Sequence, residues 1–137
     1  MTTQDVASKL SQQGCALEAR AQARRTEAVA ARAQAKAYGV LAEACQQRAR
    51  ALRNVFRANQ LLVASTPNDA AECERAAGDG RRAHASASSV EREASAHESG
   101  ARRANAEVLR ADAEAETSSL KARVLQASWR TGFPGRA

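Results

Sequence analysis

The sequence predicts an all-α protein, a long antiparallel two-helix coiled-coil hairpin with its turn near residues 65–69. Three observations support this fold class. The 137 residues include 35 alanines and 18 arginines but no isoleucine, a composition typical of long helices and coiled coils. Small or apolar residues recur at heptad spacing along most of the chain. One strong helix break lies almost at the chain midpoint, so two arms of similar length can fold back on each other.

The first arm is expected to be a helix over residues 3–64. Steps of alternately four and three residues from Leu10 to Val63 meet only two polar side chains, Arg24 and Asn59. Charged residues fall almost wholly outside this series. We therefore expect these positions to form a heptad seam that faces the second helix.

The turn is expected at residues 65–68, within Ser65-Thr66-Pro67-Asn68-Asp69. Proline disfavours helix in the residue before it and suits the first turn of the next helix. A hydroxyl of Ser65 or Thr66 is expected to cap the N–H groups of that second helix.

The second arm is expected over residues 69–130. The same stepping rule from Cys73 to Trp129 meets two exceptions, His97 and Ser118, so this arm also carries a seam. Pairing about the break predicts partners whose residue numbers add up to about 132. Cys45 would then lie near Ala87.

The two arms are expected to form one hairpin domain over residues 1–131, followed by a flexible tail at 132–137. Trp129 continues the seam and is expected to close the open end of the hairpin, whereas Phe133 is a candidate apolar handle in the tail. Because alanine and glycine bury little apolar area, we expect a marginally stable assembly.

Charge is concentrated on the first arm. Through Thr66 the chain has ten basic and four acidic residues, and the remainder has eleven of each. No acid occurs from Ala44 to Asn68, although this stretch contains four arginines: Arg48, Arg50, Arg53 and Arg57. Heptad spacing places Arg50, Arg53 and Arg57 on one flank of the seam, and the apolar residues Leu41, Val55 and Leu62 on the other. We interpret this half of the arm as a docking surface for an acidic protein partner. A solvated charged face with a widened core is the alternative.

The sequence carries no motif for catalysis or cofactor binding. It lacks a Ser/His/Asp arrangement, an H-E-x-x-H sequence and a phosphate-binding loop, so we expect a non-enzymatic protein without a cofactor. Three cysteines without C-x-x-C spacing argue against a zinc site and a disulfide framework. No secretory signal or long apolar run is visible, so a cytoplasmic protein without membrane insertion is expected.

A chain of this length, folding as one Arg-rich and Ala-rich hairpin with both termini at one end, resembles the FliJ/YscO-type stalk proteins of flagellar and type III secretion systems. The resemblance rests on architecture and covers the whole chain. It implies a cytoplasmic export component that contacts the hexameric secretion ATPase and links it to the export gate or to chaperones. Arg48, Arg50, Arg53 and Arg57 would then meet acidic partner surfaces.

Two other classes stay open. One is a self-assembling helical scaffold or chaperone, suggested by surplus apolar positions outside the seam: Val29, Val40, Leu61, Leu109, Leu120 and Val124. The other is a basic nucleic-acid-associated helical protein. The acids of the second arm and the scarcity of aromatic residues disfavour it.

Overall fold

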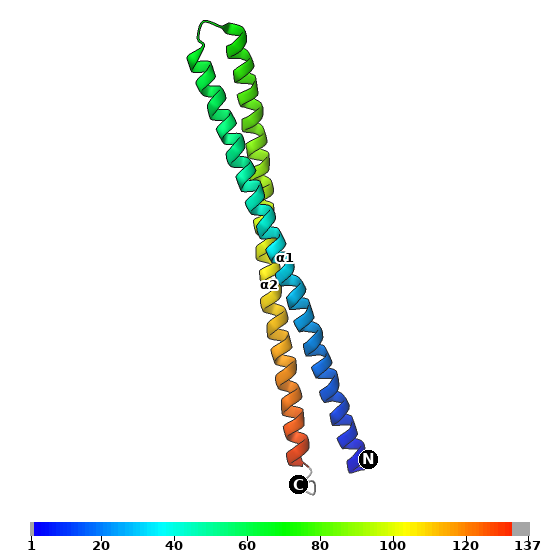
Figure 1. Cartoon of the computed structure of the whole chain (residues 1–137). Coiled ribbons are helices and arrows are strands. Elements are labelled where there is room, and N and C mark those ends of the chain that lie inside the picture. Colours follow the sequence, from blue (N-terminus) through cyan, green and yellow to red (C-terminus); the bar gives the residue numbers. More distant parts are fainter. Residues whose placement is uncertain (1, 133–137) are drawn as a thin grey trace. The chain divides into compact units, whose positions relative to one another are not determined.

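The computed structural model describes residues 2–132, and only the backbone at residues 129, 131 and 132. It contains two α-helices, α1 Thr3–Ser65 and α2 Ala70–Gly132, which pack against each other as an antiparallel hairpin (Figure 1). The described residues contain no strand. The all-α hairpin predicted from the sequence is therefore confirmed, and α2 extends two residues beyond the expected boundary at 130.

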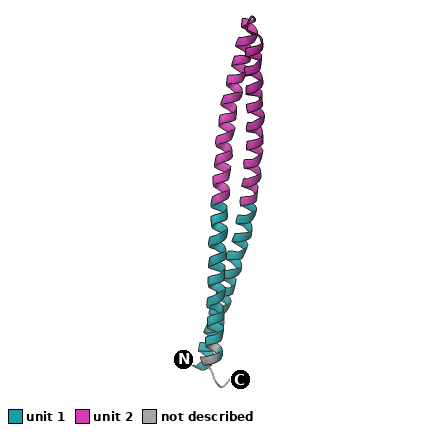
Figure 2. Cartoon of the chain, turned by 90° about the vertical axis from the view of Figure 1, so that its left-hand side faces the viewer, with its two compact units in different colours: residues 1–34, 103–137 teal, residues 35–102 magenta. Residues whose placement is uncertain are grey.

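The hairpin divides into two compact units, each made of one segment of α1 and one of α2 (Figure 2). Unit 1 contains residues 1–34 and 103–137, and unit 2 contains residues 35–102. Both chain ends therefore belong to unit 1, and the turn belongs to unit 2. The single hairpin domain expected over residues 1–131 stays a prediction.

A reciprocal cap starts α1. The backbone N–H of Thr2 donates to Asp5 Oδ2 at 3.1 Å, and the backbone N–H of Asp5 donates to Thr2 Oγ1 at 3.3 Å. These bonds satisfy N–H groups that have no partner within the helix. The hydrogen bonds from Thr2 also lower the pKa of the Asp5 carboxyl, because they favour its charged form.

The turn shows that the predicted cap of the second helix was wrong. Asp69, not Ser65 or Thr66, caps α2, since Asp69 Oδ1 accepts from the backbone N–H of Glu72 at 3.1 Å. The hydroxyls of Ser65 and Thr66 point back into α1, where each donates at 2.7 Å to the carbonyl four residues earlier. Serine and threonine often form such bonds to the preceding turn of their own helix. Pro67 lies in the turn itself, closed by Asp69 N–H donating to Thr66 O at 3.2 Å.

The predicted heptad seams form the interface between the helices. Every position of the first series is buried or half-buried, and so is every position of the second series up to Leu125. The least exposed side chains are small, with Ala21, Ala28 and Ala87 among those at 0% exposure. The alanine pattern therefore reflects direct packing of one helix against the other.

Polar residues in the seam have specific partners. Arg24 Nε lies 2.7 Å from Glu114 Oε2 across the hairpin, and its Nη1 donates to Glu27 at 2.9 Å. Asn59 Nδ2 donates to the Val55 carbonyl at 3.0 Å. These contacts allow two polar side chains to occupy seam positions without losing their hydrogen bonds.

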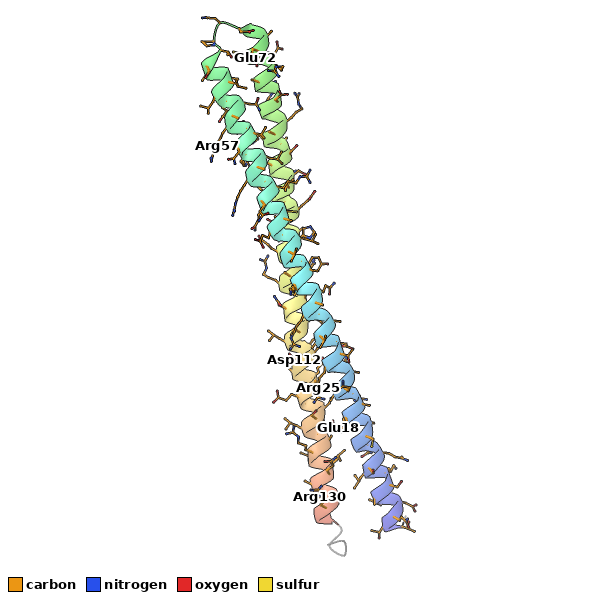
Figure 3. All side chains as sticks on the ribbon, viewed as in Figure 1. Glu18, Arg25, Arg57, Glu72, Asp112 and Arg130 are labelled. Atoms are coloured by element: carbon orange, nitrogen blue, oxygen red, sulfur yellow. The ribbon has the colours of Figure 1, made fainter. Side chains whose placement is uncertain are left out.

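Polar pairs join the two helices within each unit. In unit 1, Arg25 donates to Ser119 at 2.7 Å and Arg32 donates to Asp112 at 2.6 Å. Figure 3 labels one residue of each pair, Arg25 and Asp112. Gln46 donates to Glu98, and Arg53 donates to Glu91 at 3.1 Å, in unit 2. The residue numbers of all four pairs add up to 144, which is the heptad-spaced pairing of one helix edge with another.

The predicted register about a sum of 132 was therefore wrong. Cys45 Sγ lies 3.9 Å from Glu93 Oε2, whereas Ala87 was its expected neighbour. The turn between Ser65 and Ala70 is centred beyond residue 66. In addition, each side chain leans toward the N-terminus of its own helix. A side chain therefore contacts a residue of the other helix with a higher number than the one directly opposite its own Cα, and the two residue numbers add up to more than 132.

The expected roles of Trp129 and Phe133 fall outside the described residues. This holds for the side chain of Trp129 and for the whole of Phe133. Most of the predicted tail at 132–137 lies outside them as well, and Gly132 ends α2.

Candidate protein-binding face

All seven residues predicted to bind a partner lie on the α1 segment of unit 2. The three apolar ones are well exposed: Leu41 at 48%, Val55 at 47% and Leu62 at 42%. Arg48, Arg50 and Arg57 are exposed too, and Figure 3 shows Arg57 on the side of α1 away from α2. The structure therefore leaves six of the seven side chains open to a partner.

Arg53 is the exception, because it is engaged within the hairpin. Its Nε and Nη2 each donate to one carboxylate oxygen of Glu91 at 3.1 Å, and its Nη1 lies 2.7 Å from His84 Nδ1. The hydrogen bonds from Arg53 lower the pKa of the Glu91 carboxyl. His84 also lies against Phe56, with ring centroids 5.1 Å apart. The guanidinium of Arg53 is therefore used in contacts between α1 and α2, and it is less available to another molecule than the other three arginines.

The other three predicted arginines differ from Arg53. Arg48, Arg50 and Arg57 form no ion pair with any residue in the described part of the chain. By contrast, Arg75, Arg82 and Arg110 on α2 each pair with an acid three residues earlier. The absence of acids from Ala44 to Asn68 explains the difference, since α1 has no neighbour of opposite charge to offer here.

A shallow groove of about 520 Å³ runs between these basic side chains. Arg50, Arg53 and Arg57 line it together with Asn54 and Glu91. Arg48 does not, because it lies on the other side of α1. Its number differs by seven from those of Leu41 and Val55, so the helix places all three in one row. The four predicted arginines therefore occupy three different sides of the helix.

Sequence reasoning missed a row of exposed alanines on α1. Ala37, Ala44, Ala51 and Ala58 are exposed and occur at every seventh position. They lie on the side of α1 opposite to its seam, between the row of Leu41 and the row of Val40. The signal was available as a second heptad series. It was hidden because alanine is common throughout the chain.

Unit 1 has a smaller apolar groove of its own. It has a volume of about 440 Å³ and is lined mainly by Leu17, Leu120, Val124 and Leu125. Leu120 is 49% exposed and Val124 63% exposed. This groove is the feature that best fits the scaffold alternative.

The described residues contain no group of three or more His, Cys, Asp or Glu side chains arranged to hold a metal ion. Neither described helix has an apolar stretch long enough to cross a bilayer. Comparison with protein-family models, curated proteins and solved structures gives no match for the chain.

Proposed function

We propose that this chain is a non-enzymatic helical adaptor that binds an acidic protein surface through the α1 segment of unit 2. One observation carries the proposal. Arg48, Arg50 and Arg57 are exposed, form no ion pair with another described residue and lie beside exposed apolar side chains. Unpaired charges beside exposed apolar side chains are more typical of a protein interface than of a face that contacts only solvent.

The more specific form of the proposal follows the architectural resemblance. The adaptor acts in the cytoplasm as a stalk or adaptor of a type III secretion export apparatus, where it binds the hexameric secretion ATPase and the export gate or chaperones. The antiparallel hairpin, with both chain ends in unit 1, supports this reading.

The test uses a purified hexameric secretion ATPase and the full-length chain. Binding and ATP hydrolysis are compared for the wild type, the variant R48E/R50E/R57E and the control R81E/R92E/R103E. Arg81, Arg92 and Arg103 are exposed on α2 and form no ion pair with a described residue, so both variants change the charge equally. We expect the first variant to bind at least about tenfold more weakly, a loss of about 1.4 kcal/mol spread over three charges.

Two results would contradict the proposal. One is equal binding by both variants, which would mean that net charge alone matters. The other is ATP hydrolysis by the isolated chain, which would contradict a non-enzymatic role. Binding that requires nucleic acid and collapses with added salt would instead favour a polyanion binder.

Self-assembly is a second candidate function, favoured by the apolar groove of unit 1. If the groove holds a second copy of the chain, L120K/V124K should shift the molar mass measured by light scattering from a multiple of the chain mass to the monomer. A wild-type chain that is already monomeric at high concentration would exclude this function.

A further inference from the structure

The outer face of α1 in unit 2 is a strip of small and apolar side chains, interrupted by Gln47, Arg48 and Asn54, with no partner within the described hairpin. We define this outer face as the four alanines at positions 37, 44, 51 and 58 together with the large side chains on either side of them: Val40, Leu41, Val55, Leu61 and Leu62. Val40 is 60% exposed and Leu61 67% exposed. The strip runs for about 38 Å along the helix at 1.5 Å per residue.

Its pattern matches the surface that an α-helix packs against. The alanines occur at heptad spacing, so they stay on one line along α1. Leu41, Val55 and Leu62 form an apolar shoulder on one side, and Val40 and Leu61 lie at the two ends of the other side, with Gln47 and Asn54 between them. Small residues on that line allow a second helix backbone to approach closely, while the large apolar side chains beside it supply apolar area. Exposed apolar side chains gathered along one face of a helix favour a protein interaction site.

We infer that the outer face binds an α-helix of another protein that carries acidic residues along one of its two flanks. The inference rests on the proposed function, which makes this segment the binding face for an acidic partner, and it adds the form and the charge pattern of that partner. Charge complementarity at the border formed by Arg50 and Arg57 carries the argument.

One border of the outer face is basic. Arg50 and Arg57 lie on it without ion pairs to described residues. No acid of α1 is available between Ala44 and Asn68 to neutralise them. A helix with acids on this flank would supply the missing opposite charges.

The other border carries no net charge, because the unpaired Arg48 of α1 and Glu93 of α2 lie on the same side. Glu93 forms no ion pair with a described residue, and its Oε2 lies 3.9 Å from Cys45 Sγ, next to the row of Leu41 and Arg48. Asp79 lies in the same heptad row of α2 and pairs with Arg82. This border therefore gives no preference for either charge, and a neutral second flank suits it.

A second copy of this chain does not fit the outer face. Symmetric pairing of two outer faces would bring the acid-free stretch of one copy against that of the other. Residues 37–62 of each copy contain four arginines and only one acid, Glu43, so positive charge would oppose positive charge along most of the face. The partner is therefore a different protein.

The experiment measures the affinity of the full-length chain for two labelled synthetic peptides by fluorescence anisotropy. Both peptides have the same Ala/Leu heptads over about 28 residues, long enough to form helix. One carries Glu along one flank and Gln along the other, and the second carries Lys in place of Glu. We expect the acidic peptide to bind at least about tenfold tighter than the basic one, and less so at high salt.

Three variants of the chain make the test specific. R50E/R57E should remove the preference for the acidic peptide, whereas the control R81E/R92E should keep it. A44Q/A51Q should lower the affinity for both peptides at least about tenfold. Glutamine preserves the helix, but its larger side chain fills the space along the alanine row where the peptide backbone would approach. Circular dichroism of each variant checks that the hairpin is folded.

Equal affinity for the two peptides, loss of the preference in R81E/R92E, or binding of neither peptide would overturn the inference. These outcomes are separable from those of the proposed function. If binding of the secretion ATPase depends on Arg48, Arg50 and Arg57 but neither peptide binds, the adaptor function stands and the helix-binding mode fails. If the acidic peptide binds as expected and the ATPase does not, the outer face is a helix-binding site and the secretion assignment fails.

Discussion

The ring of Tyr38 on α1 lies directly against Gly100 on α2. A Cβ atom added to Gly100 would come within 3.0 Å of ring carbons Cδ1 and Cε1, closer than such atoms pack. His97, one turn earlier on α2, lies on the same ring with centroids 6.1 Å apart. The only tyrosine of the chain is therefore accommodated in an alanine seam because α2 has a glycine opposite it.

This contact predicts opposite effects for two glycine substitutions. Gly39→Ala should stabilise the hairpin by about 1 kcal/mol, because alanine favours helix and nothing lies within 4 Å of the added Cβ. Gly100→Ala should lose that gain to overpacking against Tyr38, which costs about 1–3 kcal/mol. Urea denaturation followed by circular dichroism measures both. In a Tyr38→Ala background, Gly100→Ala should become stabilising, and if it does not, the ring contact is not the cause.

The cap of α2 gives a second prediction. Asp69→Ala should destabilise the hairpin by about 1 kcal/mol, because the N–H of Glu72 loses its acceptor at the start of the helix. Ser65→Ala removes a hydroxyl that only bonds back to Leu61 O and should change stability by less than about 0.5 kcal/mol. Equal losses in the two variants would argue that Asp69 has no special role in capping.

The alanine seam gives a third prediction. Ala28 has 0% exposure, so Ala28→Leu should force the helices of unit 1 apart at this point and cost about 1–3 kcal/mol. Ala30, two residues later, is exposed, and Ala30→Leu should be neutral within about 0.5 kcal/mol. Thermal unfolding of both variants tests the close packing. A stabilising Ala28→Leu would mean that the seam has room for a larger side chain.

The Arg53–Glu91 pair gives a pH-dependent prediction. Arg53 lowers the pKa of Glu91 in the folded state, so this carboxylate contributes stability above its unfolded pKa of about 4.3. The contribution is lost as the pH falls through the lower folded pKa. Glu91→Gln should therefore reduce the urea midpoint at pH 7, and the difference from the wild type should shrink toward pH 3.

Glu74 provides the matched control, since it is exposed and forms no ion pair with a described residue. Glu74→Gln should leave the urea midpoint close to that of the wild type at both pH values. A Glu91→Gln effect of the same size at pH 3 and pH 7 would show that the loss does not come from the charge.

Periodicity was enough to predict the helices and the seam, because a heptad series specifies which side of a helix is buried before any partner is known. Leu10 to Val63 and Cys73 to Leu125 occupy the predicted side. The register was not predictable in the same way. It depends on where the turn is centred and on the lean of side chains along each helix, and neither is visible in a repeat that matches equally well after a shift of seven residues.

The candidate face was predicted only in part. Composition identified Arg48, Arg50, Arg53 and Arg57 as an acid-free group, but composition does not say which of them meets an acid from the other helix. Arg53 meets Glu91 because the two lie 38 positions apart in sequence and opposite each other in the hairpin. The exposed alanines at 44 and 51 were missed, since small residues on an outer helix face look the same in sequence as those in a seam.

Helix binding at the outer face is tested most directly by locating the bound peptide on the chain. The acidic peptide is added to the isotopically labelled full-length chain, and the backbone amide chemical shifts are measured by NMR. We predict the largest changes at Ala44, Ala51 and Ala58 on the outer face of α1, with little change at Arg81 and Arg92 on α2. Changes centred on α2, or spread evenly along both helices, would contradict helix binding at this face.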